Sequence, residues 1–144
     1  MFFSRLFGLK TPAPKENIAT IEWIKGKSGK YFRLISIDEN SRDLVQQGGV
    51  FLIWAKWGNK TTWLYVGSTA DLGKSFKNAK NDPQIMAYEG KGRIGVTWAL
   101  SNPKYRGRIA TYLKTLLKPV IDKPELSEES NFSTEPFAVY PPVI

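Results

Sequence analysis

The sequence predicts an α/β fold, with a small and mainly antiparallel sheet flanked by helices. Three stretches support this prediction. Residues 49–76 contain two apolar runs that are joined by a short polar link and followed by a helix-type pattern. Residues 93–101 alternate apolar side chains with small, polar or charged ones, which is typical of a strand. Residues 106–118 repeat apolar side chains at the spacing of an amphipathic helix.

The central strand is expected at residues 50–57. This run is apolar on both of its faces and therefore suits a strand that is covered on two sides. Residues 58–61 are polar and turn-like, and a second apolar run follows at residues 62–66. This arrangement predicts a hairpin.

Helices and a further strand are expected around this hairpin. Residues 68–71 match a helix-capping box. The helix that follows has an apolar face made of Leu72, Phe76 and Ala79. Residues 16–23 predict a short helix and residues 31–37 a strand. Asp82 before Pro83 indicates the start of another helix, which we expect to run to residue 88.

The chain divides into three parts. Residues 1–15 form an apolar and basic arm with a Pro-containing linker. Residues 16–121 carry the apolar periodicity of one compact α/β domain. Residues 122–144 are acidic and rich in proline, which predicts an extended tail.

Composition limits the chemistry that this chain can perform. Cysteine and histidine are both absent, which excludes disulfides, zinc–thiolate sites and any Ser-His or Cys-His catalytic pair. The net charge of +8 is uneven, because residues 1–121 carry +12 and residues 122–144 carry −4. Such a basic body suits a polyanion, an acidic protein surface or anionic lipid. Ordinary surface charge is the alternative explanation.

Residues 67–75, GSTADLGKS, are similar to a phosphate-binding loop but have the wrong spacing. That loop requires four residues between its first glycine and the Gly-Lys pair, whereas five separate Gly67 from Gly73. We therefore expect no nucleotide site there and interpret the stretch as the start of a helix.

Two short motifs resemble those of a known family. Gly49-Val50-Phe51 and Tyr65-Val66-Gly67 resemble the two triads of the GIY-YIG nuclease superfamily. Leu116-Leu117-Lys118-Pro119 resembles the closing helix and proline of that family. The resemblance covers residues 49–119 and implies that the triads lie on neighbouring strands with a helix after them.

The same resemblance implies a catalytic set that this chain lacks. The family is understood to use a tyrosine in each triad, an arginine on the next helix and a metal-binding glutamate on a later helix. Only Tyr65 remains here, because the first triad ends in Phe51 and the arginine and glutamate positions are Ser75 and Ala110. We therefore expect a degenerate GIY-YIG-like domain that is not an enzyme and holds neither a metal nor another cofactor.

Basic residues around the former catalytic position are candidates for binding phosphates. In a GIY-YIG-like fold, the lysines after Tyr65 would border the former catalytic face, and together with the cations at the start of the last helix they would neutralise several phosphates of a nucleic acid. Tyr65 is a further candidate, with a structural role in its strand as the alternative. The six cations are Lys74, Lys77, Lys80, Lys104, Arg106 and Arg108. A solvated helix face is the alternative for the lysines.

Aromatic and apolar residues at both ends of the chain are candidates for docking. They are Phe2, Phe3, Leu6 and Phe7 in the arm, and Phe137 and Tyr140 in the tail. The arm suits a protein partner or the surface of a membrane, where Arg5 and Lys10 would lie at the headgroups. The alternative is that these side chains pack on the domain itself.

The function that we expect from the sequence is a non-catalytic binding or scaffold module in a protein assembly. Non-specific nucleic-acid binding through a basic face is the alternative, and a divergent metal-dependent nuclease around Tyr65 is a third hypothesis. No apolar run reaches the ~20 residues that a transmembrane helix needs, so we expect a cytoplasmic protein that either is free or lies at a membrane surface.

Overall fold

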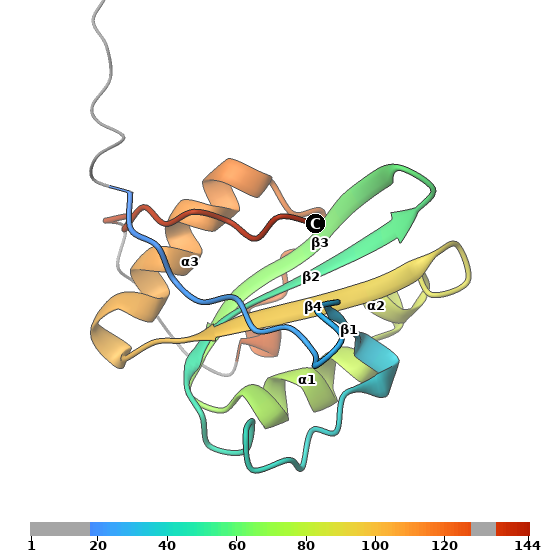
Figure 1. Cartoon of the computed structure of the whole chain (residues 1–144), viewed down its shortest axis with the longest axis horizontal. Helices are drawn as coiled ribbons and strands as arrows, with labels where there is room; N and C mark the ends of the chain where they lie inside the picture. Colours follow the sequence, from blue (N-terminus) through green and yellow to red (C-terminus); the bar gives the residue numbers. More distant parts are fainter. Residues whose placement is uncertain (1–17, 128–134) are drawn as a thin grey trace, which may run out of the picture.

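The computed structural model describes residues 18–127 and 135–144. In this part of the chain, a four-stranded antiparallel sheet with the order β1-β4-β2-β3 carries three α-helices (Figure 1). The strands are β1 (Phe32–Arg33), β2 (Gly49–Trp57), β3 (Lys60–Thr69) and β4 (Arg93–Leu100). The helices are α1 (Leu72–Lys80), α2 (Pro83–Met86) and α3 (Pro103–Leu117), with short 3-10 helices η2 (Leu34–Ser36) and η3 (Pro124–Leu126). The predicted α/β class is confirmed.

Strand β2 lies between β4 and β3, and both of its faces are buried as the sequence predicts. On one face, Val50, Leu52 and Trp54 pack with Ile109, Ala110 and Leu113 of α3. On the other, Phe51, Ile53 and Ala55 pack with Leu72, Phe76 and Ala79 of α1. Helices α1 and α3 therefore cover opposite faces of the sheet.

The hairpin between β2 and β3 is tighter than the sequence predicts. Trp57 pairs with Lys60, so the turn consists of Gly58 and Asn59 alone. Gly58 has φ of 61°, a left-handed conformation that a two-residue turn requires and that glycine adopts without strain. The expected strand at 62–66 accordingly extends in both directions.

Helix α1 begins later than the predicted capping box. Strand β3 continues to Thr69, which pairs with Gly49, so Ser68 is still in the sheet and cannot cap a helix. Asp71 is the N-cap instead, and its carboxylate accepts a hydrogen bond from the backbone N–H of Lys74 (3.2 Å).

The helix predicted at residues 16–23 is wrong over its described part. Residues 18–24 form no helix, and Ala19 lies in an isolated bridge with Val139. Ala19 exchanges hydrogen bonds with Ala138 and Tyr140 (3.0 Å each), and the Ile24 N–H donates to Trp98 O (2.9 Å). An isoleucine every third residue is compatible with a helix, but these hydrogen bonds to distant residues replace the hydrogen bonds that a helix would form within the segment.

Three other boundaries differ from the prediction. Only Phe32 and Arg33 of the strand expected at 31–37 pair with β4, and η2 follows them directly. Helix α2 begins at Pro83 with Asp82 as its cap, as predicted, but is one turn long. Helix α3 begins at Pro103, three residues before the predicted start, because Asn102 caps it.

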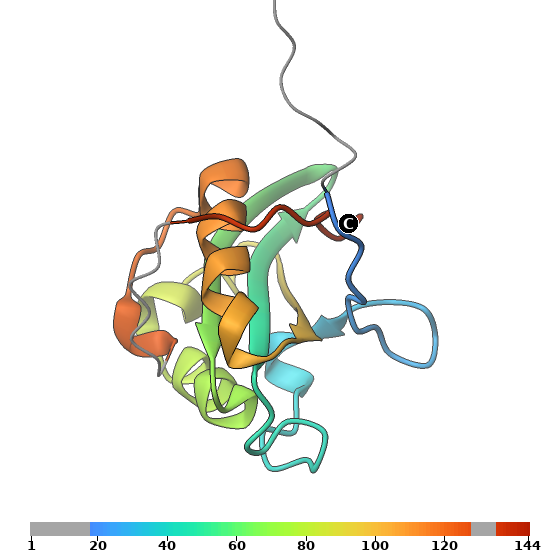
Figure 2. The ribbon, with the colours of Figure 1, turned by 90° about the vertical axis from the view of Figure 1, so that its left-hand side faces the viewer.

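Two C-terminal segments close the domain. The N–H groups of Val120 and Ile121 donate to Trp63 O and Leu64 O (3.1 and 3.0 Å), which covers part of the free edge of β3. Residues 135–144 cross α3 toward the N-terminal segment (Figures 1 and 2). No helix within the described ranges is long and apolar enough to cross a lipid bilayer.

Candidate binding surfaces

Tyr65, the remaining tyrosine of the two triads, is sealed inside the domain. Its side chain is 2% exposed, and its hydroxyl donates to Lys123 O (2.7 Å) while it accepts from Ser127 Oγ (2.8 Å). Burial raises the pKa of Tyr65 to about 12, and the Ser127 hydrogen bond opposes this change. The hydroxyl is therefore neutral at physiological pH and is covered by the chain itself.

The other positions that the resemblance assigns to catalysis also lie in the core. The ring of Phe51 stacks on that of Tyr65 with centroids 5.6 Å apart. Ser75 is fully buried and donates from its Oγ to Thr69 Oγ1 (2.8 Å). Ala110 packs on the opposite face of the sheet, within the cluster under α3. These positions do not converge on one solvent-accessible point.

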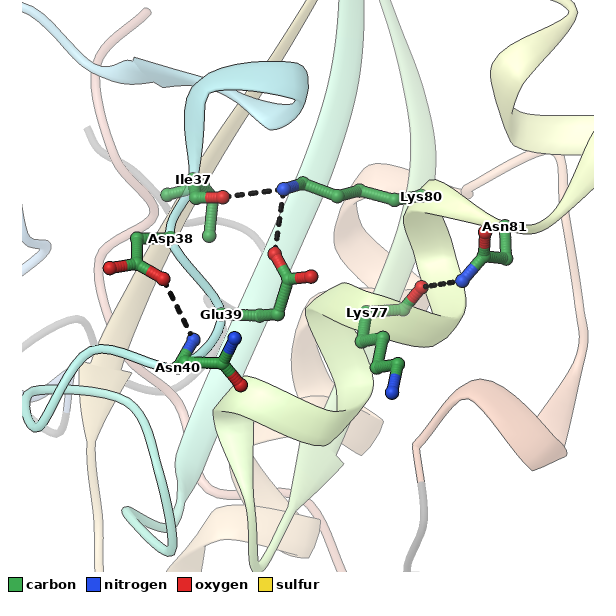
Figure 3. A network of polar contacts seen from close by, with 7 residues as sticks. All are labelled: Ile37, Asp38, Glu39, Asn40, Lys77, Lys80 and Asn81. Carbon is green, nitrogen blue, oxygen red and sulfur yellow. Dashed lines mark hydrogen bonds and ion pairs between the residues drawn. The ribbon is translucent and has the colours of Figure 1, made fainter.

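The lysines of α1 differ in their surroundings, and Figure 3 shows two of them, Lys77 and Lys80. Lys80 donates to Ile37 O and to Glu39 Oε1, the latter at 2.7 Å, and so holds the segment before β2 against the helix. The Lys80 hydrogen bond, followed by a bond from the backbone of Glu39 itself, lowers the pKa of Glu39. Lys74 and Lys77 are exposed, whereas Lys80 stabilises the fold.

The cations of α3 differ in the same way. Arg106 is 7% exposed and donates from Nη1 to Ser101 O (3.4 Å), next to the start of the helix. Arg108 donates from Nε to Glu135 O (3.2 Å), and its guanidinium lies over the rings of Tyr105 and Phe137. Lys104 alone of the three is exposed, and its Nζ lies 5.3 Å from the centroid of the Tyr105 ring.

The predicted basic face is therefore divided. Lys74, Lys77 and Lys80 belong to α1, and the other three cations belong to α3, which covers the opposite face of the sheet. Arg106 and Arg108 also contact their own chain. The structure does not bring the six predicted cations together.

The predicted docking residues of the tail pack at least partly on the domain. Phe137 lies against Tyr105 with ring centroids 5.1 Å apart, and its N–H donates to Arg108 O (3.1 Å). Tyr140 stays 50% exposed beside the segment that contains Ala19. Phe2, Phe3, Leu6 and Phe7 lie outside the described residues.

A basic cavity that the sequence did not reveal lies where β1, β4 and the β2–β3 hairpin meet. Its volume is about 610 Å³. Its cationic lining comes from Lys30, Arg33, Lys56 and Arg93. Of the aromatic residues that border it, Tyr31 and Trp54 belong to the core cluster under α3, whereas Phe32 and Trp57 pack against the cluster under α1. The remaining lining residues are Gly58, Gly92, Ile94, Gly95 and Ile144, so no Asp or Glu side chain lines it.

The cations of this cavity are held by the sheet register. Lys56 on β2 is paired with Arg93 on β4, so both side chains lie on the same face of the sheet. Both are exposed, and neither has a carboxylate partner within the described part of the chain. Arg33 differs, because it forms an ion pair with Glu89.

The aromatic base of the cavity depends on a glycine. The indole of Trp54 lies on the backbone of Gly95, where a Cβ atom would come within 2.6 Å of Trp54 Cε2. Tyr31 and Trp63 meet this indole edge-on at 5.3 and 5.7 Å. Gly95 therefore leaves room for the rings of Tyr31, Trp54 and Trp63 to form a row across one face of the sheet.

Sequence analysis missed this cavity because its residues come from separate strands. The alternation of β2 does place Lys56 on the same face as Trp54, which a pattern search could have found. The pairing of Lys56 with Arg93 depends on a register that neither strand reveals by itself.

Comparisons with protein-family models, with curated proteins and with solved structures find no match to this chain. The GIY-YIG resemblance therefore stays a prediction. Within residues 18–127 and 135–144, no three His, Cys, Asp or Glu side chains form a group that could hold a metal ion.

Proposed function

We propose that this chain is a non-catalytic binding module and that its partner is anionic. The observation that carries the proposal is the pair formed by Lys56 and Arg93 at the cavity. Like charges directly opposite each other on neighbouring strands repel and destabilise a sheet. An anion that bridges the two side chains would turn this repulsion into attraction.

The proposal that the module is not an enzyme is supported by Tyr65. A hydroxyl that activates water or contacts a phosphate has to reach the substrate. Here, Lys123 and Ser127 occupy its hydrogen-bonding positions. The nuclease hypothesis predicts metal-dependent nicking of nucleic acid that Tyr65→Phe abolishes, and we expect no such nicking by the unaltered chain.

The proposed function can be tested with inorganic polyphosphate as the anion. We expect the double variant Lys56→Gln/Arg93→Gln to bind at least about tenfold more weakly, with a smaller dependence of the binding constant on salt. The midpoint temperature of thermal unfolding of this variant should be unchanged or slightly higher, because the variant removes a repulsion between the two side chains.

The matched control is Lys74→Gln/Lys77→Gln, which removes the same charge from the exposed face of α1. We expect this control to weaken polyphosphate binding much less. Equal losses in the two double variants would show that only overall charge matters and would contradict a site at the cavity.

A second candidate is docking in a protein assembly through the chain ends. One observation favours it. The hydrogen bonds of Ala19 with Ala138 and Tyr140 place the residues that follow the N-terminal arm beside the C-terminal segment. In that segment, Tyr140 is 50% and Val143 86% exposed. The arm and these two side chains could therefore meet one partner.

Salt distinguishes the two candidates. Binding to phosphates weakens steeply as ionic strength rises, whereas apolar docking does not. Docking through the arm would be supported if the full-length protein retains a partner at high salt and a variant without residues 1–10 loses it. Unchanged retention after this deletion would refute that candidate.

A further inference from the structure

We propose that the side of the domain covered by α3 docks on the surface of an anionic lipid membrane. The basic cavity would take the phosphate of one lipid headgroup, and Tyr140 and Val143 of the C-terminal segment would enter the apolar boundary of the bilayer. This inference rests on the proposed function, since it names the anionic partner of the same two cations, Lys56 and Arg93.

The α3 side of the sheet is rich in cations. Strands β2, β3 and β4 and helix α3 contain no Asp or Glu. By strand alternation, Lys56 and Arg93 lie on the face that Trp54 shares with α3. Helix α3 and its C-cap add three exposed lysines, which are Lys104, Lys114 and Lys118.

Few carboxylates oppose these cations. The two segments that pack on this side, residues 18–24 and 135–144, contain one acidic residue each, Glu22 and Glu135. Other acidic residues lie around α1 and α2, where Asp71 and Asp82 are the helix caps and Glu39 is bound by Lys80. The α3 side therefore has a positive charge that attracts an anionic surface.

Exposed apolar side chains lie on the same side as these cations. The C-terminal segment packs in the cluster under α3 through Val139 and Ile144, and Ile144 also lines the basic cavity. Between these two residues, Tyr140 is 50% and Val143 86% exposed. At a membrane surface, such apolar groups enter the bilayer while neighbouring cations stay with the headgroups.

The combination of cations and apolar groups favours lipid over nucleic acid. The backbone of a nucleic acid would use Lys56 and Arg93 in the same way, but it offers nothing apolar for an exposed Val143. The cavity volume of about 610 Å³ lies within the range of roughly 300–1,000 Å³ that small-molecule sites occupy, which leaves room for one headgroup. A membrane therefore accounts for both kinds of side chain.

The first test is co-sedimentation of the full-length chain with vesicles of phosphatidylcholine, with and without about one third phosphatidylserine. We expect binding to the anionic vesicles and none to the neutral ones. Each basic residue at an anionic surface typically strengthens binding about fivefold. Lys56→Gln/Arg93→Gln and Lys104→Gln/Lys118→Gln should therefore each weaken vesicle binding by at least about tenfold. The matched control Lys74→Gln/Lys77→Gln on α1 should weaken it by no more than about twofold.

A second pair of variants tests the apolar contact without changing charge. Val143→Gln should weaken vesicle binding by at least about threefold and leave the binding of inorganic polyphosphate unchanged. The matched control is Val45→Gln, because Val45 is 40% exposed but lies beside α1, where the Gly73 N–H donates to Leu44 O (3.1 Å). This control should leave both kinds of binding unchanged.

The outcomes distinguish this inference from the proposed function. A chain that binds polyphosphate through Lys56 and Arg93 but does not prefer anionic vesicles would overturn the membrane inference and leave the anion site in place. Binding of a single-stranded oligonucleotide but not of vesicles would identify a nucleic acid instead.

The N-terminal arm has to be separated from this surface. If vesicle binding is lost on deletion of residues 1–10 but is unchanged in Val143→Gln and in Lys104→Gln/Lys118→Gln, the arm alone is the membrane contact and the inference is wrong. If Lys56→Gln/Arg93→Gln changes binding neither to vesicles nor to polyphosphate, both proposals fail.

Discussion

Replacing Tyr65 with phenylalanine tests whether the second triad contributes to stability through a buried hydroxyl. The change removes one oxygen and leaves the ring that stacks on Phe51. Without this oxygen, Lys123 O and Ser127 Oγ each lose a hydrogen-bonding partner. Ser127 is 7% exposed, so water cannot easily replace the lost group. We expect Tyr65→Phe to lower the free energy of unfolding at pH 7 by about 1–3 kcal/mol.

The pH dependence of stability gives a second, independent value for the contribution of the Tyr65 hydroxyl. Burial raises the pKa of Tyr65 from 10.0 to about 12. The protonated hydroxyl therefore contributes stability that is fully present below pH 10 and is lost as the pH rises through 12. A pKa difference of about two units corresponds to about 2.7 kcal/mol in the free energy of unfolding, of which about 1.4 kcal/mol is lost by pH 11.

The assay is chemical denaturation of both proteins at pH 7, 9, 10 and 11. All other ionisable groups are the same in the two proteins, so the difference between their stabilities isolates Tyr65. We expect the stability advantage of the unaltered chain to shrink between pH 9 and pH 11. Tyr112→Phe is the control, because the hydroxyl of this half-buried tyrosine has no hydrogen bond within the described residues.

Two results would refute this reasoning. A difference between Tyr65→Phe and the unaltered chain that is constant from pH 7 to pH 11 would show that the hydroxyl is not sealed. A loss at pH 7 no larger than that of Tyr112→Phe would show that the segment carrying Lys123 and Ser127 does not hold it. Tyr65 would then again be accessible to a ligand.

Two further substitutions test how the cavity and the C-terminal segment are held. Gly95→Ala places a Cβ atom 2.6 Å from the Trp54 indole and should cost about 1–3 kcal/mol in thermal unfolding, whereas Gly90→Ala, with nothing within 4 Å, should be neutral or slightly stabilising. An equal effect of the two would contradict the close contact. Asp82→Ala removes the cap on α2 and the 2.6 Å ion pair with Lys123, so we expect a loss of about 1–3 kcal/mol in denaturant unfolding. A loss below about 0.5 kcal/mol would mean that neither contact is formed in solution.

Local patterns predicted the elements whose partners are near in sequence or whose periodicity is strong. The two apolar faces of β2 and the alternation of β4 require only a count along the chain, because strand side chains alternate with period two. Asp82 before Pro83 predicted the start of α2 for an equally local reason, since the cap and the first turn lie within four residues.

Predictions failed where a distant segment competed with a local preference. Residues 18–24 do not form the predicted helix, because Ala19 and Ile24 bond to the C-terminal segment and to β4. Arg106 was predicted to bind a partner, yet it is buried at the start of α3. For residues 18–24, contacts between residues that are far apart in sequence outweigh a weak local propensity. Arg106 is buried beside Gly48, a neighbour that the sequence near Arg106 does not reveal.

The sequence by itself determined that this is a basic α/β protein with a sheet covered on both sides and without histidine or cysteine chemistry. Tertiary structure alone decided which cations stay accessible. The register of β4 on β2 brings Arg93 opposite Lys56. Helix α1 carries Lys74, Lys77 and Lys80 on one face of the sheet, and α3 carries the other three predicted cations on the opposite face. Strand register and helix placement minimise the free energy of the whole domain, so no single stretch of sequence specifies them.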